Sequence, residues 1–284
     1  MSALARVSGP TRALPALKAA YALARRAGWL DRRWFRRLYV SAYFAYKRHV
    51  EDPFDALLRR RPELVRGGSV ADVGAHVGYT ASVFCEALDP GFRVYAFEAD
   101  PANVRLLLET LVSQIALGRV VAVEAAVGSG AGTAELLRSA VHPGDHRIGT
   151  PAFQAQGVRD AVQVSVVSLD EFFASRPDEP LAFVKVDVQG YEIEVCRGMA
   201  RTLERCPSAA VAVEYAPDEA KAMGFDPADI ERYFRARGYS LHLLRRDGVL
   251  EGWHAGQVAA LVARRGYVDL LCLRGAGAEA SAVH

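Results

Sequence analysis

The sequence predicts an α/β fold, a doubly wound parallel sheet with helices on both faces. Between residues 68 and 128, short apolar runs alternate with segments of helical periodicity, the order that builds a parallel sheet. Gly74 and Gly78 follow the first apolar run directly, as in a tight turn from a strand into a helix. The 284 residues are 51% hydrophobic, which is ample for a large core.

Turn residues and periodicity place the individual elements in order along the chain. The predicted strands cover residues 67–75, 92–100, 119–128, 132–139, 162–170, 181–190, 209–215, 239–248 and 266–275. The predicted helices cover residues 52–64, 80–88, 101–117, 168–175, 191–206 and 227–237. Ser168 is a plausible helix cap, and Pro101 suits a first helical turn. The polar, Gly- and Pro-containing stretch 140–161 is too long for an ordinary connection, so we expect a functional loop there.

The turn "DVGAHVG", residues 72–78, predicts a binding site for a nucleoside cofactor. Ligands of doubly wound sheets lie beyond the carboxyl ends of the strands, where Gly74 and Gly78 let the backbone approach closely. Glu98 ends the second strand 20 residues after Gly78, where a carboxylate can accept hydrogen bonds from both hydroxyls of a ribose. His76 replaces the middle glycine of a nicotinamide fingerprint, and Asp72 suits a cationic ligand, so S-adenosylmethionine is favoured over NAD.

Five segments, in this order, resemble the FkbM family of S-adenosylmethionine-dependent methyltransferases: "VADVGAHVGYTA", "VYAFEADPANVRLL", "EAAVGSGAGTAEL", "VSLDEFF" and "VKVDVQGYEIEVCRGMARTL". The similarity covers roughly residues 50–272. It implies a Rossmann-like, seven-stranded class I methyltransferase sheet whose last two strands form a hairpin, the seventh being antiparallel. It also implies O-methylation of a hydroxyl on a sugar, glycolipid or natural product. The chain departs from the family's common residues at His76 (Asn), Ala99 (Pro) and Gln189 (Glu).

The expected site lies at the ends of the strands that face the cofactor. The residues expected to bind S-adenosylmethionine are Asp72, Gly74, Ala75, His76, Gly78, Tyr79, Thr80, Glu98, Ala99, Asn103, Ala126, Val127 and Asp187. The candidates for proton transfer are Asp187, His76, Glu214 and Lys185, because each carries a titratable group near a strand end or in the turn. Each also has a structural alternative: Lys185 pairs with Asp187 or Glu214, Asp187 holds the cofactor ammonium, Glu214 caps or pairs, or His76 packs over the adenosine. We predict no metal site, since Asp187 with Glu214, or "HPGDH" at 142–146, lacks a third ligand at suitable spacing.

Residues 1–50 form a basic, aromatic-rich helical arm. They hold nine arginines and two lysines against Asp31 alone, a net charge of +10, while the rest of the chain carries −8. We expect the arm to pack on the body. The alternatives are peripheral contact of residues 20–50 with an anionic membrane at its inner face, a lid, or a homodimer contact. The domain proper is expected over 51–274, with a disordered tail over 275–284.

The partner is predicted to be a small-molecule or glycoconjugate acceptor, with no nucleic acid. The first residues lack the uninterrupted apolar core of a signal peptide, and the four cysteines are scattered and expected to be reduced, so we predict a cytoplasmic protein. Two other functions remain open at this point. One is a nicotinamide-dependent oxidoreductase, and the other is a non-catalytic, membrane-associated binding module.

Overall fold

The structure, a computed structural model, describes residues 33–139, 146–154 and 160–274. Its main sheet has eight strands in the order β11-β10-β12-β9-β8-β1-β2-β3. Their bounds are Leu250–Gly252 for β11, Ser240–Leu244 for β10, Val268–Leu273 for β12, Ala210–Tyr215 for β9, Leu181–Val186 for β8, Ser69–Val73 for β1, Val94–Glu98 for β2 and Val120–Glu124 for β3. The strands from β9 to β3 pair in parallel, and β12 is antiparallel to both β9 and β10.

The seven expected strands are therefore present, and the antiparallel seventh is β12. The short strand β11 is an eighth that the sequence did not predict. It pairs with β10, so the tight hairpin is β10–β11 rather than β10–β12. A helix that was also not predicted, α13 (Ala255–Arg265), lies between β11 and β12.

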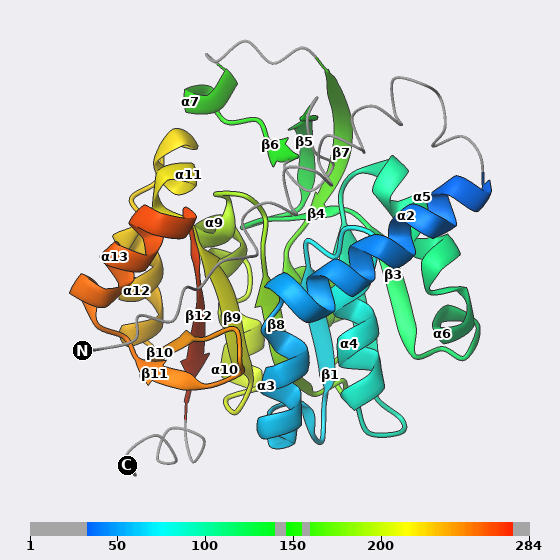
Figure 1. Cartoon of the computed structure of the whole chain (residues 1–284). Helices are drawn as coiled ribbons and strands as arrows, with labels where there is room; N and C mark the ends of the chain where they lie inside the picture. Colours follow the sequence, from blue (N-terminus) through cyan, green and yellow to red (C-terminus); the bar gives the residue numbers. More distant parts are fainter. Residues whose placement is uncertain (1–32, 140–145, 155–159, 275–284) are drawn as a thin grey trace, which may run out of the picture.

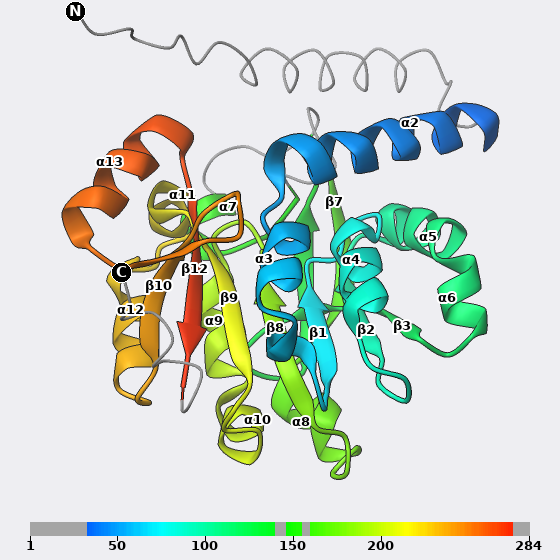
Figure 2. The ribbon, with the colours of Figure 1, turned by 60° about the horizontal axis from the view of Figure 1, so that its bottom comes forward.

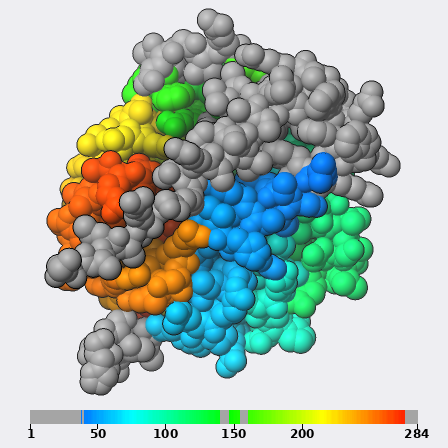
Figure 3. All heavy atoms as spheres, viewed as in Figure 1, coloured from blue at the N-terminus to red at the C-terminus, as the bar shows by residue number. Residues whose placement is uncertain are grey.

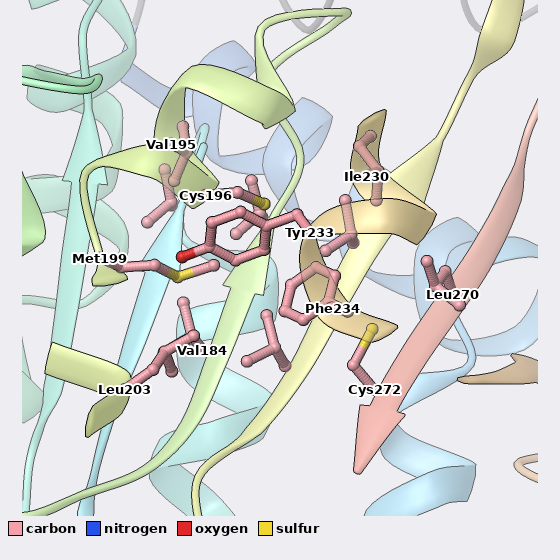
Figure 4. Close-up of a cluster of buried hydrophobic side chains, with 14 of the residues drawn as sticks. Val184, Val195, Cys196, Met199, Leu203, Ile230, Tyr233, Phe234, Leu270 and Cys272 are labelled. Atoms are coloured by element: carbon pink, nitrogen blue, oxygen red, sulfur yellow. The ribbon is translucent and has the colours of Figure 1, made fainter. Parts of the chain in front are cut away.

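Helices cover both faces of this sheet (Figure 1). One face carries α3 (Phe54–Arg60), the 3-10 turn Pro62–Val65, α4 (Tyr79–Ala87) and α5 (Pro101–Thr110). The other carries α8 (Leu169–Ala174), α9 (Glu192–Arg197), α10 (Ala200–Arg205) and α12 (Ala228–Arg235). Strand side chains alternate between the faces, so Val70 joins the first core while Ala71 and Val73 join the second. In the second core Tyr233 and Phe234 reach from α12 toward the sheet (Figure 4).

Several predicted elements are interrupted in the structure. The helix expected over 101–117 breaks at Leu111 into α5 and α6 (Val112–Ala116), and the helix over 191–206 breaks into α9 and α10. Helix α11 (Pro217–Ala222) was not predicted. The capping prediction at Ser168 is confirmed, because its side chain accepts from the Glu171 amide in a capping box. All four cysteines are buried and free, as expected.

A second, four-stranded sheet stands beyond the carboxyl ends of the main strands (Figure 1). Its order is β4 (Ala126–Val127), β7 (Ala161–Val167), β5 (Gly132–Leu137) and β6 (Arg147–Ile148). The sequence predicted β5 and β7 but not their separate sheet, since the strand expected over 119–128 is divided at Ala125. The long loop contains β6 and α7 (Pro151–Gln154), and its residues 140–145 and 155–159 lie outside the described part.

The arm contributes α2 (Arg33–Tyr46) and a π-helical turn, η2 (Lys47–Glu51), which cross the carboxyl end of the sheet (Figure 2). Tyr43 is buried among the side chains of α3 and α4, and its ring packs edge-on against that of His76. In the space-filling view this blue segment adjoins the orange β10–β11 region (Figure 3), where Arg246 bonds to the carbonyl of His49. Residues 1–32 and the tail 275–284 lie outside the described residues. No helix within the described ranges has the length and hydrophobicity needed to cross a bilayer.

Tyr43→Ala should lower the free energy of unfolding by ~2–4 kcal/mol, because it removes a buried aromatic ring that joins the arm to the body. Leu38→Ala is the control on the same helix, since Leu38 is 61% exposed and should change stability little. Urea unfolding of the full chain measures both. Equal stability of the two variants would contradict packing of α2 on the body.

Candidate active site

The turn after β1 is held by the strands on both sides of it. The amides of Gly74 and Ala75 both donate to the carbonyl of Phe97, at 3.0 and 2.9 Å. Gly74 has a φ of +80°, and a Cβ there would collide with the carbonyl oxygen of Asp187. Glycine is therefore required at 74 for close contact between the ends of β1 and β8, as well as for the left-handed backbone.

Two non-glycine residues in the described chain have positive φ, His76 at 50° and Gln189 at 56°. Each costs conformational energy, and such strain is concentrated at functional sites. Both residues line the same cavity. The Nδ1 atom of His76 lies 3.3 Å from the Tyr43 hydroxyl, so the arm orients this imidazole.

Glu98 is the acid at the end of β2 and is 9% exposed. One carboxylate oxygen accepts from the Asp100 amide at 2.9 Å and the Asn103 side chain at 3.3 Å, and the other accepts from the His76 amide at 2.8 Å. A carboxylate offers about four acceptor positions, so these bonds leave room for a hydroxyl donor. Burial raises the pKa of Glu98 to about 7, although these hydrogen bonds lower it.

Lys185 is a buried cation that joins β1 to β8. Its Nζ lies 3.4 Å from carboxylate oxygens of both Asp72 and Asp187, and it donates to the carbonyl of Gly74 at 3.0 Å. Burial lowers the pKa of Lys185, but the two carboxylates outweigh burial and raise it above its ordinary value. Lys185 is therefore paired with both carboxylates, which agrees with the structural alternative given for it, and its part in proton transfer stays a prediction.

Gln189 bridges two carboxylates. Its amide nitrogen donates to Asp187 and to Glu214, at 3.2 Å each. Burial, and then the charges of Asp187 and Glu192, raise the pKa of Glu214 well above its usual range. For Asp187, burial is outweighed by Lys185 and Lys47, which lower the pKa. Asp187 is thus the more readily ionised member of the pair, and Glu214 is the one that holds its proton more strongly.

These groups surround a cavity of about 650 Å³. The predicted residues on its wall are Gly74, His76, Glu98, Ala99, Asn103, Ala126, Val127, Asp187 and Glu214. The predicted residues that are not on this wall are Asp72, Ala75, Gly78, Tyr79, Thr80 and Lys185. Asp72 is fully buried, where it accepts from Thr80 at 2.6 Å and faces Lys185. In this geometry Asp72 contacts Lys185, and its expected contact with a cofactor cation stays a prediction.

Several wall residues were not singled out from the sequence as site residues. The arm contributes Tyr43, Tyr46, Lys47, Val50 and Glu51, and the last third of the chain contributes Glu219, Arg246, Arg264, Arg265 and Tyr267. The aromatic and basic interleaving of residues 29–48 was the available signal for the first group. In the second group, Arg264 and Arg265 were missed because α13 was not predicted, and Glu219 because α11 was not predicted. No pattern in the sequence marked Arg246 or Tyr267 as a site residue.

The histidine-containing loop does not gather metal ligands in the part that is described. His146 lies 3.4 Å from Asp100, which also pairs with Arg138 at 2.5 Å. His142 and Asp145 lie outside the described residues. No group of three or more His, Cys, Asp or Glu residues suited to a metal occurs within the described ranges.

The strand order, the acid at the end of β2 and the cavity between them define a class I, S-adenosylmethionine-dependent methyltransferase. The chain belongs to the FkbM methyltransferase family, whose domain, Methyltransferase FkbM, matches residues 72–241.

The individual proteins that resemble this chain share less than 30% of the aligned residues with it. The hexuronic acid methyltransferase AglP of Haloferax volcanii is 28% identical over 179 residues, which are 62% of this chain and 66% of the relative. A methyltransferase FkbM structure from Methylobacillus flagellatus is 15% identical with a TM-score of 0.49, covering 84% of this chain and 53% of its own. The O-methyltransferase TomG of Streptomyces achromogenes, solved with S-adenosylmethionine, is 12% identical with a TM-score of 0.40, covering 78% and 79%. The chain thus spans about two thirds of the curated relative and about half of the first structure.

Affinity for S-adenosylhomocysteine should fall about tenfold between about pH 8 and about pH 6, if an ionised Glu98 accepts ribose hydroxyls. The sign follows from the raised pKa of about 7, because protonation below it removes acceptor positions. Glu98→Gln should bind more weakly and lose this dependence. Calorimetry at several pH values measures both.

The matched control is Glu192→Gln. Burial also raises the pKa of Glu192 to about 7, but this residue is not on the cavity wall, and one of its oxygens accepts from both Val188 and Gly190. A glutamine oxygen can keep both bonds, so the pH dependence should persist. An unchanged dependence in Glu98→Gln would rule out the ribose role.

Gln189→Glu should destabilise the protein by ~1–3 kcal/mol at about pH 8 and little at about pH 5. A third carboxylate beside Asp187 and Glu214 would have a raised pKa, so its penalty is absent below its unfolded pKa and grows as pH rises toward the folded value. Gln163→Glu makes the same change at an exposed position of β7 and should show no such pH dependence. Urea unfolding at the two pH values measures the free energy of unfolding of both variants. The same pH dependence in both would contradict the bridging role of Gln189.

Proposed function

We propose that this protein transfers a methyl group from S-adenosylmethionine to a hydroxyl of a sugar, glycolipid or natural product. The observation that carries the proposal is the Asp187–Gln189–Glu214 group on the cavity wall. A hydroxyl must lose its proton on methylation, and an ionised carboxylate that is a third exposed can accept it. The likeness to a hexuronic acid methyltransferase supports a sugar acceptor.

The residues on the cavity wall fit the cofactor. Glu98 would hold the ribose, with Asn103 fixing its carboxylate, while Ala99, Ala126 and Val127 supply apolar surface for the adenine. When bound, the cofactor supplies an electrophilic methyl group on a sulfonium. An NAD-dependent oxidoreductase is disfavoured by family membership and by His76 in place of a glycine beside Glu98.

The remaining steps, proton transfer and alignment of the hydroxyl, would be carried out by side chains of this protein. Asp187 would accept the hydroxyl proton, held in position by Lys185 and Gln189. The protonated Glu214 would donate a hydrogen bond rather than compete as a base. His76, oriented by Tyr43, is the second candidate base because its titration range suits neutral pH. Much of the rate would come from alignment and the exclusion of water, to which the arm residues contribute a wall.

The arm is best explained as part of this site. Tyr43 is buried against the body, and Lys47 and Glu51 pair at 2.5 Å on the cavity wall. This placement supports packing over membrane contact or dimerisation for residues 40–51. The cytoplasmic location stays a prediction.

Asp187→Asn should lower turnover by ~10²–10⁴-fold while changing S-adenosylhomocysteine affinity much less, because it keeps the shape but removes the base. His76→Ala should lower turnover less. Labelled cofactor and a panel of sugar and glycolipid acceptors would identify a methylated product first, and rates would then be compared on that acceptor. Near-native turnover in both variants would show that catalysis depends mainly on positioning of the substrates. Glu214 would then be the next residue to test as the proton acceptor. Wild-type protein that binds NADH but not S-adenosylhomocysteine would end the methyltransferase proposal.

A further inference from the structure

Three arginines gather at one end of the cavity. Arg264 and Arg265 occupy the last turn of α13, and Arg246 lies in the turn between β10 and β11. All three line the main cavity and are exposed. Arg246 and Arg265 also line an adjoining cavity of about 560 Å³. Basic residues suit a helix C-terminus anywhere on a surface, but here two separate elements direct them at one space.

No acid in the described part of the chain forms an ion pair with these arginines. The neighbouring Arg245 is paired, with Asp247 at 3.4 Å and Glu251 at 2.6 Å. Elsewhere near the cavity, Arg138 pairs with Asp100 and Arg147 with Glu219. The guanidinium of Arg246 bonds to the carbonyl of His49, which fixes its direction without neutralising its charge. The three arginines therefore keep guanidinium groups that are free of ion pairs within the described residues, although acids such as Glu51 and Asp247 line the adjoining cavity.

The sheet order separates the arginines from the expected cofactor side. Helix α13 leads into β12, and β12 is four positions from β2 in the order β12-β9-β8-β1-β2. At about 4.8 Å per strand, this separation is roughly 19 Å. Figure 1 shows α13 near one edge of the sheet and α5 near the other. Between them lie Asp187 and Glu214, which end β8 and β9. The arginines thus face the acceptor's part of the cavity, not the ribose at Glu98.

The charged groups between Asp187 and the three arginines differ in sign. An ionised Asp187 would repel an anionic group but can accept a hydrogen bond from a hydroxyl. Guanidinium groups bind carboxylate and phosphate oxygens with two parallel hydrogen bonds. One acceptor molecule that satisfies both ends therefore has a hydroxyl at one position and an anion at another.

We propose that the methyl acceptor is an acidic sugar or sugar-like molecule whose carboxylate or phosphate is bound by Arg264 and Arg265, with Arg246 beside them. Its reacting hydroxyl then faces Asp187. This inference rests on the proposed methyltransferase function and deepens it by giving the acceptor's charge.

The test measures binding of glucuronic acid, glucose 6-phosphate and glucose to the S-adenosylhomocysteine-loaded full chain. Calorimetry at low salt should show at least one anionic sugar bound about tenfold or more tightly than glucose. Arg264→Gln with Arg265→Gln should remove that preference and leave S-adenosylhomocysteine affinity unchanged. Arg105→Gln is the control, because Arg105 is exposed on α5 and lines none of the cavities described. Comparing the two anionic sugars separates a carboxylate from a phosphate.

An anionic preference that is absent from the wild type, or that survives in the double variant, would overturn the proposal while leaving the methyltransferase function intact. If the double variant lost affinity only for phosphatidylglycerol vesicles, the arginines would face a membrane and the proposal would be wrong. Absence of S-adenosylhomocysteine binding would instead overturn the proposed function itself.

Discussion

The site depends on one buried charge, the ammonium of Lys185. Residues 72 and 185 are direct partners across the β1–β8 pair, so the sheet register alone brings Lys185 beside Asp72. The same ammonium reaches Asp187 and the carbonyl of Gly74, which joins the ends of both strands at the point where each chain turns. Removing one partner from a buried pair leaves an uncompensated charge and is far costlier than losing a surface pair. The turn that carries His76 and the carboxylate of Asp187 are therefore fixed relative to each other before any ligand binds.

Acids outnumber bases around this cation, and the excess determines the protonation states. Two lysines, Lys47 and Lys185, stand among Asp72, Asp187, Glu214 and Asp269 in the interior. Not every carboxylate can ionise there. At Asp187 the two lysines outweigh burial and lower the pKa. Burial and neighbouring acids raise the pKa of Glu214, and burial raises that of Asp269 to about 7. A charged carboxylate beside a neutral one can accept one proton and donate another, which suits chemistry on a hydroxyl. Gln189 preserves this arrangement because it gives hydrogen bonds to both without adding a further negative charge.

The sequence predicted those features that depend on local patterns. Alternating apolar runs located the strands, and Gly74 and Glu98, which the sequence singled out, both lie on the cavity wall. A glycine at one strand end and an acid at the next are visible in one dimension. What the sequence missed depends on contacts between distant segments. Asp72 was expected to contact the cofactor, because the sequence does not show that Lys185, which is 113 positions away, lies beside it. Gln189 looked like a lost charge, and only the structure places it between two carboxylates. Helix α13 was missed although Val258, Leu261 and Val262 have helical spacing and pack on the core.

The core sheet and the inserted segments carry different parts of the function. Strand ends of the main sheet supply Glu98, Asp187 and Glu214, the carboxyl groups that the proposed function uses. The remaining walls come from segments outside the parallel strands: the arm, the second sheet, the β10–β11 turn and α13. The second sheet supplies apolar side chains such as Val127, Leu136 and Ile148. The other segments supply arginines, aromatics and paired ions, which in the proposed function would recognise the acceptor. The arm also acts on the groups beneath it, because Lys47 lowers the pKa of Asp187 and Tyr43 contacts His76. The two parts of the molecule are therefore coupled at the arm, and a change there should alter both the proposed acceptor wall and the proposed base.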